Sequence, residues 1–420
     1  MKNAICPKIF ISLKKGYTKK QFINDIVAGI IVAIIALPLS IALALASGVK
    51  PEQGIYTAIT AGFVISFLGG SNVQISGPTA AFATIVAGIV AESGMSGLVT
   101  ATFLAGIMLV VMGLFGLGKL IKYIPKTITV GFTSGIAVTL IIGQLKDFFG
   151  LTFNESPIET MEKLKEAIHC FSTINYEAFA VGILSLVILL VFPKIFKKIP
   201  PSLFAVVITA VVVKIFNLNV NTIGSLYEIT SGLPQFAIPE IAGDSVLKLL
   251  PDAFTIAILA GIESLLSCVV SDGMIKDKHS PNTELVAQGA GNIVSSLFGG
   301  IPATGAIART AANVKNGGRT PVSGMVHAIV LLAVLLFLMP YASLIPMPTI
   351  AAILFVVAYN MSEYKHFFKL MTKSKLSDVI VLIITFAFTV IFDLVVAIAI
   401  GLAVHYAFVL LTKLFKVKKK

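Results

Sequence analysis

Tryptophan is absent from the sequence, cysteine occurs only three times, and charged residues are scarce. Charged residues make up 12% of the chain and hydrophobic residues 57%, whereas a soluble domain has roughly 25% charged residues. No soluble fold of 420 residues hides so much apolar surface, so the composition predicts an integral membrane protein. The cysteines Cys6, Cys170 and Cys268 are odd in number and widely spaced, so we expect neither a disulfide framework nor a metal site from them.

Signatures of enzymes and pumps are also missing. The sequence has no glycine-rich phosphate-binding loop with a lysine, which argues against an ATP-driven pump, and no paired His/Glu zinc motif. Alternating polar and apolar strands are absent, which disfavours an outer-membrane barrel. We therefore expect neither enzymatic activity nor a bound cofactor.

Apolar segments recur along the whole chain and predict a helical membrane protein. A membrane-spanning helix needs about 20 apolar residues, and a broken span or half-helix needs fewer. Fourteen segments qualify, and the last two could also form one long segment. The segments are residues 22–46, 52–69, 77–91, 97–115, 125–145, 176–193, 201–216, 252–271, 285–299, 304–314, 321–340, 343–360, 376–392 and 394–412.

The net charge of +12 is distributed in short runs between these apolar segments. The positive-inside bias of membrane proteins produces this arrangement, so we do not expect nucleic acid as a partner. Lysines are concentrated at both ends, in residues 8–20 and 413–420, whereas the long loops 146–175 and 217–251 are rich in acidic residues. The distribution predicts cytoplasmic termini, an even number of spans, external long loops and residence in the inner (plasma) membrane.

Two segments far apart in the chain share one pattern. They read SFLGGSNVQISGPTAAFATIVA (66–87) and SSLFGGIPATGAIARTAA (295–312). Each has an apolar helix that ends in Gly-Gly, a short extended stretch, and a helix start rich in small and hydroxyl residues. Seven spans separate the copies, so the second copy runs inverted relative to the first. Interrupted segments at matching positions of inverted halves are typical of a transporter's binding site.

The repeat predicts two half-helices that begin near mid-membrane, at residues 76–79 and 303–306. Since they run in opposite directions, their N-termini face each other and present unpaired N–H groups and the positive ends of two helix dipoles. Two such ends make an anion-binding site. The alternative is a pair of ordinary Gly/Pro kinks in packed helices, and the repetition in register favours the site.

Two charged residues lie within apolar segments near these helix starts. Arg309 is one turn into the second half-helix, where it either lends positive potential to an anion or extends to the cytoplasmic surface. Glu263 lies about eleven residues after Asp252, deeper than any other acid, with Ser267 one turn later on the same face. A carboxylate at this depth carries a proton, ligates sodium, or forms a structural ion pair with Arg309.

Four stretches of the chain carry a family resemblance. They are DIVAGIIVAIIALPLSIALALASGVKPEQGIYTAITAG, SGPTAAFATIVA, ELVAQGAGNIVSSLFGGIPATGAIARTAANVKNGGRTPVSGMVHA and AILFVVAYNM. Together they resemble the SulP family of sulfate permeases and related anion exchangers, over essentially the whole chain. The resemblance implies an all-α membrane protein of fourteen spans in a seven-plus-seven inverted repeat, the fold of uracil permease. It also implies an elevator mechanism, in which a core domain slides against a gate domain.

The family fold implies boundaries for these domains. The implied parts are a cytoplasmic N-terminus (1–21), core-domain segments with spans 1–4 (22–118) and 8–11 (252–342), gate-domain segments with spans 5–7 (119–251) and 12–14 (343–412), and a basic cytoplasmic tail (413–420). Most family members carry a STAS domain after the last span, and this sequence stops at Lys420 without one.

The resemblance also implies roles for individual residues. The family's anion site, between the starts of spans 3 and 10, falls on Ser76, Gly77, Pro78, Thr79, Ala80, Thr304, Gly305 and Ala306, and its span-10 arginine falls on Arg309. The coupling-ion residues of span 8 fall on Glu263 and Ser267. A sodium ion held there would also involve Thr304, and a glutamate at position 263 leaves sodium and proton both open.

The sequence as a whole predicts a secondary active transporter of small anions such as sulfate, bicarbonate or dicarboxylates, coupled to protons or sodium. An uncoupled exchanger or channel on the same fold is one alternative, but it has no need of a titratable Glu263. A nucleobase permease is another, but the predicted site offers few polar groups to recognise a base. We expect a small anion and the lipid bilayer as partners, and a homodimer is left open.

Overall fold

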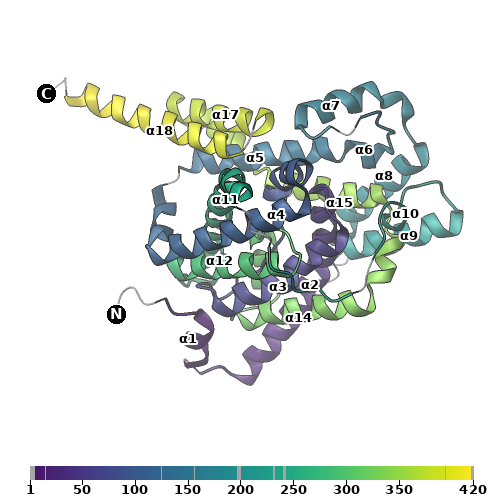
Figure 1. Ribbon diagram of the computed structural model, residues 1–420, viewed down its shortest axis with the longest axis horizontal. Helices are drawn as coiled ribbons and strands as arrows, with labels where there is room; N and C mark the ends of the chain where they lie inside the picture. Colours follow the sequence, from purple (N-terminus) through teal and green to yellow (C-terminus); the bar gives the residue numbers. More distant parts are fainter. Residues whose placement is uncertain are drawn as a thin grey trace. The chain divides into compact units, whose positions relative to one another are not determined.

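The computed structural model describes residues 5–14, 16–123, 125–155, 157–195, 200–229, 232–239, 243–392 and 394–417, so the end of the predicted basic tail lies outside the described residues. This part of the chain is predominantly helical (Figure 1). The elements are α1 (Lys8–Lys14), α2 (Lys19–Ala46), α3 (Pro51–Leu68), β1 (Ser76–Gly77), η1 (Ala80–Phe82), α4 (Ala83–Leu114), η2 (Leu117–Tyr123), α5 (Lys126–Gly143), α6 (Leu145–Phe149), α7 (Thr160–His169), η3 (Phe171–Thr173), α8 (Tyr176–Ile195), α9 (Pro201–Phe216), α10 (Ile223–Leu226), α11 (Gly243–Ile275), α12 (Pro281–Leu297), β2 (Thr304–Gly305), α13 (Ile307–Lys315), α14 (Val322–Phe337), η4 (Met339–Leu344), α15 (Met347–Met361), α16 (Tyr364–Lys373), α17 (Leu376–Ile391) and α18 (Leu394–Val417).

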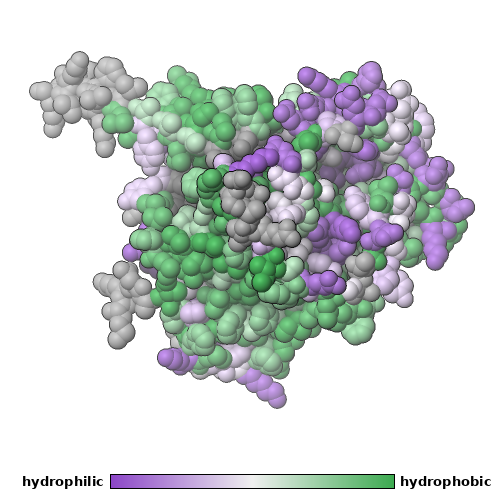
Figure 2. Space-filling view, viewed as in Figure 1, coloured by the Kyte–Doolittle hydropathy of each residue, from purple (hydrophilic) through white to green (hydrophobic). Residues whose placement is uncertain are grey.

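Each apolar segment found in the sequence overlaps at least one helix. Among the described residues, five helical stretches are long and apolar enough to cross a membrane, and α9, α14 and α17 are shorter apolar helices. On the face drawn in Figure 2, hydrophobic side chains cover much of the surface, as a lipid-facing protein requires. The fold is that of a helical membrane protein, and the full count of fourteen spans in an inverted repeat stays a prediction.

The structure defines two boundaries between predicted spans. Predicted spans 77–91 and 97–115 correspond to two helical parts of α4 that meet at a kink at Gly94, where φ is 68° and ψ is −174°. Glycine adopts such a positive φ without steric cost, so the helix can change direction there. Near the C-terminus α17 and α18 are separate helices, with residue 393 between them outside the described part.

The chain forms two compact units. The first comprises Met1–Ile121, Asp147–Gly150 and Asn175–Ile353, and the second comprises Lys122–Lys146, Leu151–Ile174 and Leu354–Lys420. In the first unit, α4 packs along α12, and α14 packs on α2 and α3. In the second unit, α5 and α18 pack against α17. The division into core and gate domains of a transport cycle stays a prediction.

Glycines permit the close contact between α4 and α12. A Cβ at Gly289 would lie 2.5 Å from the carbonyl oxygen of Gly106, and a Cβ at Gly106 would lie 2.8 Å from that of Gly289. Small residues of this kind let membrane helices approach closely, which is how they associate in the absence of a hydrophobic driving force.

The two interrupted segments meet inside the first unit. β1 and β2 form an antiparallel pair in which Ser76 faces Gly305 and Gly77 faces Thr304. The helices after them start later than the sequence suggested, at Ala80 and Ile307. Pro78 accounts for part of this difference, because a proline favours extended backbone in the preceding residue.

Candidate functional site

The strand pair β1–β2 brings the predicted anion-site residues of both repeats together. Ser76, Thr79, Thr304 and their neighbours are buried, and the backbone N–H of Ala306 donates to the carbonyl of Ile75 at 2.9 Å. The residues that precede the two helix starts, Thr79 and Ala306, provide no side-chain cap for them. Free N–H groups and two positive dipole ends therefore converge at the strand pair. Such an arrangement suits an anion.

Arg309 lies in the first turn of α13 and is turned inward. Its side chain is 1% exposed, and its Nη2 donates to the carbonyl oxygen of Pro78. Within the described residues its Nε and Nη1 have no hydrogen-bond partner, which leaves two buried donor nitrogens free beside β1. In this structure Arg309 does not extend to the surface. The geometry therefore supports the alternative in which its positive charge acts at the two helix starts, on a bound anion.

Gly77 makes room for this guanidinium. A Cβ at position 77 would lie 2.8 Å from Arg309 Nη1, and φ of Gly77 is +156°, which L-residues rarely adopt. Both the backbone conformation and the close approach therefore require glycine.

Glu263 contacts the first half-site directly. It lies in α11, is 9% exposed, and accepts a 2.9 Å hydrogen bond from Thr79 Oγ1 on its Oε2. Among the described residues, no ion pair joins Glu263 to Arg309, although their charges are close enough to interact. The carboxylate of Glu263 is thus hydrogen-bonded to Thr79, the residue just before the first helix start. Among the described residues, the structural ion pair between Glu263 and Arg309 that was considered from the sequence is not formed.

The three predicted sodium ligands have separate hydrogen-bond partners. Ser267 Oγ donates to Thr310 Oγ1 at 3.3 Å, and Thr304 Oγ1 lies 2.6 Å from Ser264 Oγ and donates to the carbonyl of Ala260. Because both hydroxyls act as donors in these contacts, each oxygen keeps a lone pair that could also ligate a sodium ion. Protonation of Glu263 would leave the Ser267 and Thr304 contacts in place. Within the described residues, no group of three His, Cys, Asp or Glu side chains is arranged to hold a metal.

The sequence analysis missed the uncharged polar residues that hold the strands. Ser264 Oγ accepts a hydrogen bond from Gly305 N, and Thr310 Oγ1 accepts one from Ile75 N, both at 3.0 Å. It also did not single out Glu284, which lies in α12 and is completely buried. The sequence did contain a sign of this buried polar face, because Glu284, Gln288 and Asn292 recur every fourth residue in a helix that is otherwise rich in apolar and small residues.

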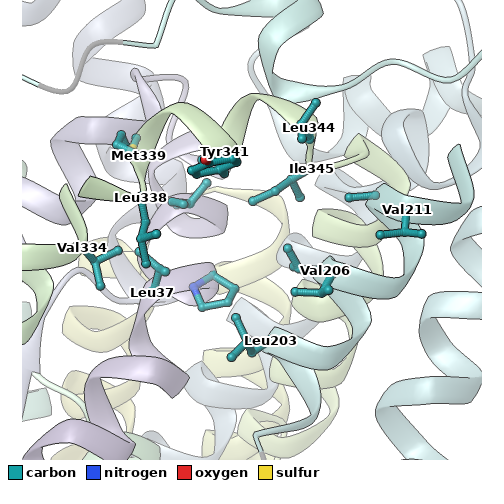
Figure 3. A pocket seen from close by; sticks show the side chains of 15 residues that line it. Leu37, Leu203, Val206, Val211, Val334, Leu338, Met339, Tyr341, Leu344 and Ile345 are labelled. Atoms are coloured by element: carbon teal, nitrogen blue, oxygen red, sulfur yellow. The ribbon is translucent and has the colours of Figure 1, made fainter. Parts of the chain in front are cut away.

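A cavity in the first unit is unsuited to an anion. It has a volume of about 300 Å³ and lies between α2, α9, α14 and η4 (Figure 3). Its walls are aliphatic side chains such as Leu37, Val206 and Val334, with Tyr341 as the one hydroxyl-bearing residue. No lining side chain carries a charge that could balance an anion, so the strand pair remains the candidate site.

Comparisons with known proteins place the chain in a family. The model of the sulfate permease family matches residues 22–385. The putative sulfate transporter YvdB of Bacillus subtilis is 48% identical over 396 residues, which cover 94% of this chain and 74% of that protein. The bicarbonate transporter BicA of Picosynechococcus is 33% identical over 396 residues, which cover 91% of this chain and 69% of BicA.

Solved structures show the same fold. The transmembrane domain of a cyanobacterial bicarbonate transporter BicA matches with a TM-score of 0.79 and 30% identity, covering 93% of this chain and 98% of that domain. SLC26A9 matches with a TM-score of 0.84 at 20% identity, covering 97% of this chain and 68% of that one, which bears on the fold alone. The extent of the family match and the similarity to YvdB and BicA together show that this chain belongs to the sulfate permease family.

Proposed function

We propose that the protein is a secondary active transporter that moves a small anion such as sulfate, bicarbonate or a dicarboxylate across the membrane together with a proton. One observation carries the proposal. Two helix starts without side-chain caps converge at β1–β2, next to an arginine with two donor nitrogens that have no partner within the described residues. The names of the relatives, sulfate and bicarbonate transporters, support the same class of substrate.

Glu263 supplies the coupling in this proposal. An ionised carboxylate beside the anion site repels the anion, and protonation removes the repulsion. The anion and the proton then each favour the other's binding, a reciprocal linkage. The hydrogen bond from Thr79 Oγ1 to Glu263 supports this assignment, because it connects the carboxylate to the helix start that would hold the anion.

We favour a proton over sodium as the coupling ion. Ser267 is hydrogen-bonded to Thr310 and Thr304 to Ser264, and within the described residues neither hydroxyl is hydrogen-bonded to Glu263, with which it would have to share a sodium ion. A proton on Glu263 needs only a small readjustment at Thr79.

The transport movement proposed here is that of an elevator. The segments 22–118 and 252–342, which include β1 and β2, would carry the anion, while 119–251 and 343–412 would form the gate. Since both half-sites lie in the carrier segments, a rigid movement of these segments would keep the anion site intact.

Uptake into proteoliposomes tests the proposal. The purified full chain is reconstituted, and entry of radiolabelled sulfate and bicarbonate is followed with an inward proton gradient, an inward sodium gradient, or neither. We expect one of these anions to accumulate above equilibrium with the proton gradient alone. Accumulation with the sodium gradient alone would show that the coupling ion is sodium and not a proton. Equilibration without accumulation would indicate an exchanger or channel, and uptake of labelled uracil in place of anions would contradict the proposal.

A further inference from the structure

Helix α12 carries four buried polar side chains on one face: Glu284, Gln288, Asn292 and Ser295. Each is 0% exposed, and their spacing of four, four and three residues places them in one stripe along the helix. We call these four residues the α12 ladder. Buried polar groups of this kind are costly unless they are hydrogen-bonded, so their partners show what they do.

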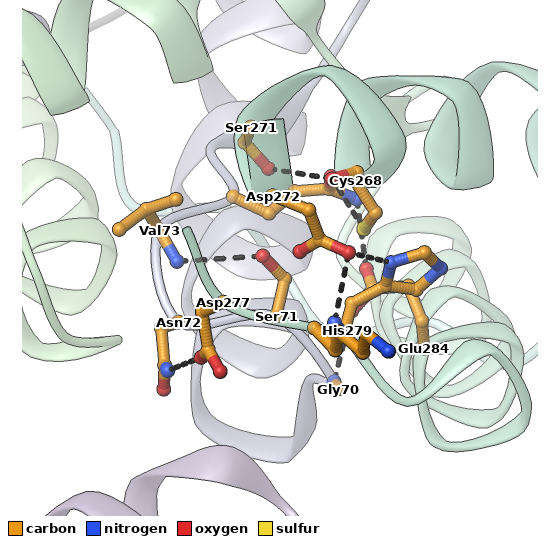
Figure 4. Close-up of polar contacts among 12 residues, drawn as sticks. Gly70, Ser71, Asn72, Val73, Cys268, Ser271, Asp272, Asp277, His279 and Glu284 are labelled. Carbon is orange, nitrogen blue, oxygen red and sulfur yellow. Dashed lines mark hydrogen bonds and ion pairs between the residues drawn. The ribbon is translucent and has the colours of Figure 1, made fainter. Parts of the chain in front are cut away.

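The first half of the ladder holds the segment that leads into β1. Glu284 Oε2 accepts the backbone N–H of Gly70 at 2.9 Å, and its Oε1 accepts Gln74 Nε2 at 2.8 Å. Gln288 Nε2 donates both to Glu284 Oε1, at 2.9 Å, and to Ser76 Oγ, at 3.2 Å. Figure 4 shows Gly70 and Ser71 near Glu284 and the end of α11, which carries Cys268 and Asp272.

The second half of the ladder holds the segment that leads into β2. Asn292 binds the backbone of Ala303 twice, donating from Nδ2 to its carbonyl at 2.9 Å and accepting its N–H on Oδ1 at 2.8 Å. Ser295 Oγ donates to the carbonyl of Ile301 at 2.9 Å. One helix therefore contacts both halves of the anion site through its side chains.

The strand pair needs such support. β1 and β2 are two residues long each, and a pair this short does not fix its own register. A shift of one residue would displace one helix start relative to the other. Resting on the function proposed above, we infer that the α12 ladder sets the register of β1 against β2, so that its residues act as positioning residues for the anion site.

Two substitutions test the two halves of the α12 ladder separately. Glu284→Gln replaces an acceptor oxygen with an NH₂ group that would face the N–H donors of Gly70, Gln74 or Gln288. Asn292→Asp places a carboxylate oxygen against the carbonyl of Ala303. Ser296→Ala is the matched control, since Ser296 is also buried on the same helix but its hydroxyl donates to the carbonyl of Ile293 within α12.

Amide hydrogen exchange of the reconstituted full chain tests the positioning role without reference to transport. We expect Glu284→Gln to speed exchange about tenfold in residues 70–74 and to leave 300–303 unchanged, and Asn292→Asp to do the reverse. Ser296→Ala should alter neither segment. Faster exchange spread over both segments and the surrounding helices, or in neither segment, would overturn the inference. If Glu284→Gln does not fold, Gln288→Leu removes the bonds to Glu284 and Ser76 and carries the same expectation for 70–74.

Uptake kinetics of radiolabelled sulfate and bicarbonate connect the ladder to the anion site. We expect Glu284→Gln and Asn292→Asp to raise the apparent KM about tenfold while the maximal rate changes far less, because a displaced half-site weakens anion binding. An unchanged KM in both variants would contradict the inference. If the parent protein transports neither anion, the proposed function fails, and the exchange experiment still decides the role of the ladder.

Discussion

Arg309 is buried with two donor nitrogens free within the described residues, and a buried guanidinium in that state is costly unless something pairs with it during the functional cycle. Arg309 contacts Pro78 at the start of the first half-site, so an anion bound there would pair with the guanidinium. The charge and the converging helix starts would then act on the same ligand. Removing the guanidinium should weaken the site without dismantling the strand pair.

We expect Arg309→Ala to raise the apparent KM for sulfate or bicarbonate about tenfold or more, the effect of losing a charge-assisted hydrogen bond. Uptake kinetics in proteoliposomes measure this, and size-exclusion chromatography shows that the variant is folded. Lys315→Ala, which removes an exposed cation from the same helix, is the control and should leave KM unchanged. An unaltered KM for Arg309→Ala would indicate that the arginine has a structural role only.

Part of this site was predictable from single residues and part was not. The positions of Arg309 and Glu263 within apolar segments were sufficient to mark them, since charges are expensive in a membrane. The direction of the Arg309 side chain was not predictable, because it is long enough to reach either the helix starts or the surface. The α12 ladder was overlooked because the recurrence of Glu284, Gln288 and Asn292 shows only that they share a helix face, and the backbone groups they contact become apparent only in the structure.

Among the elements, the contact between α4 and α12 supports the ladder, since it fixes α12 within the first unit. Gly289 lies at the crossing, where a Cβ would be 2.5 Å from the Gly106 carbonyl oxygen and 2.6 Å from Val110 N. Backbone atoms cannot move aside as a flexible side chain can. The two helices therefore depend on the absence of a side chain at this position.

We expect Gly289→Ala to destabilise the protein by about 1–3 kcal/mol, the usual cost of overpacking. Gly273→Ala is the control, because Gly273 lies in α11 with no atom within 4 Å of the added Cβ. Thermal unfolding of both variants in detergent measures the difference. Equal stability of the two would show that α4 and α12 can separate at no cost.

The short helix α1 is attached to the loop between α11 and α12. Lys8 Nζ lies 3.2 Å from Asp277 Oδ2 and donates to the carbonyl of Lys278 at 2.7 Å. Burial alone would raise the pKa of Asp277, but the N–H of Lys278 and the ammonium of Lys8 lower it below its ordinary value of 3.8. A carboxyl group whose pKa is lowered on folding stabilises the protein above the unfolded value and loses that effect as the pH falls through the folded value.

Asp277→Asn should therefore reduce stability at neutral pH and have no effect in acid. Because the pair is partly exposed, solvent screening limits the loss to about 0.5–1 kcal/mol near pH 7. Thermal unfolding of parent and variant at several pH values between neutrality and about pH 3 provides the measurement. A difference between the two that stays undiminished as the pH falls below the ordinary pKa of an aspartate would contradict the assignment.

The sequence predicted most helices because long apolar runs and Gly-Gly or Pro breaks are local signals. The pairing of Ser76 and Gly77 with Thr304 and Gly305 was not predictable in this way. It joins residues more than two hundred positions apart, and neither strand is long enough to show the alternation of a sheet. The structure therefore added the contact on which the site depends.

For the whole molecule, the lysine distribution predicts how the chain lies in the membrane. Both termini should be cytoplasmic and the loop 146–175, which contains α7, external. The native cysteines permit a simple test, because Cys6 near the N-terminus is exposed while Cys170 and Cys268 are buried.

We expect a membrane-impermeant maleimide to label Glu162→Cys in intact cells and to reach Cys6 only after permeabilisation. Glu162 is suitable because it is an exposed residue of α7. Labelling of Glu162→Cys from the cytoplasmic side alone would reverse the predicted orientation.

Coupled transport is the central claim, and Glu263→Gln tests it most directly. Glutamine mimics the neutral acid and can still interact with Thr79, so the site should continue to bind and exchange the anion. In proteoliposomes with an inward proton gradient, we predict that the parent concentrates sulfate or bicarbonate, while Glu263→Gln brings it only to equilibrium and retains anion exchange. If Glu263→Gln concentrates the anion as well as the parent does, Glu263 does not couple transport to the proton.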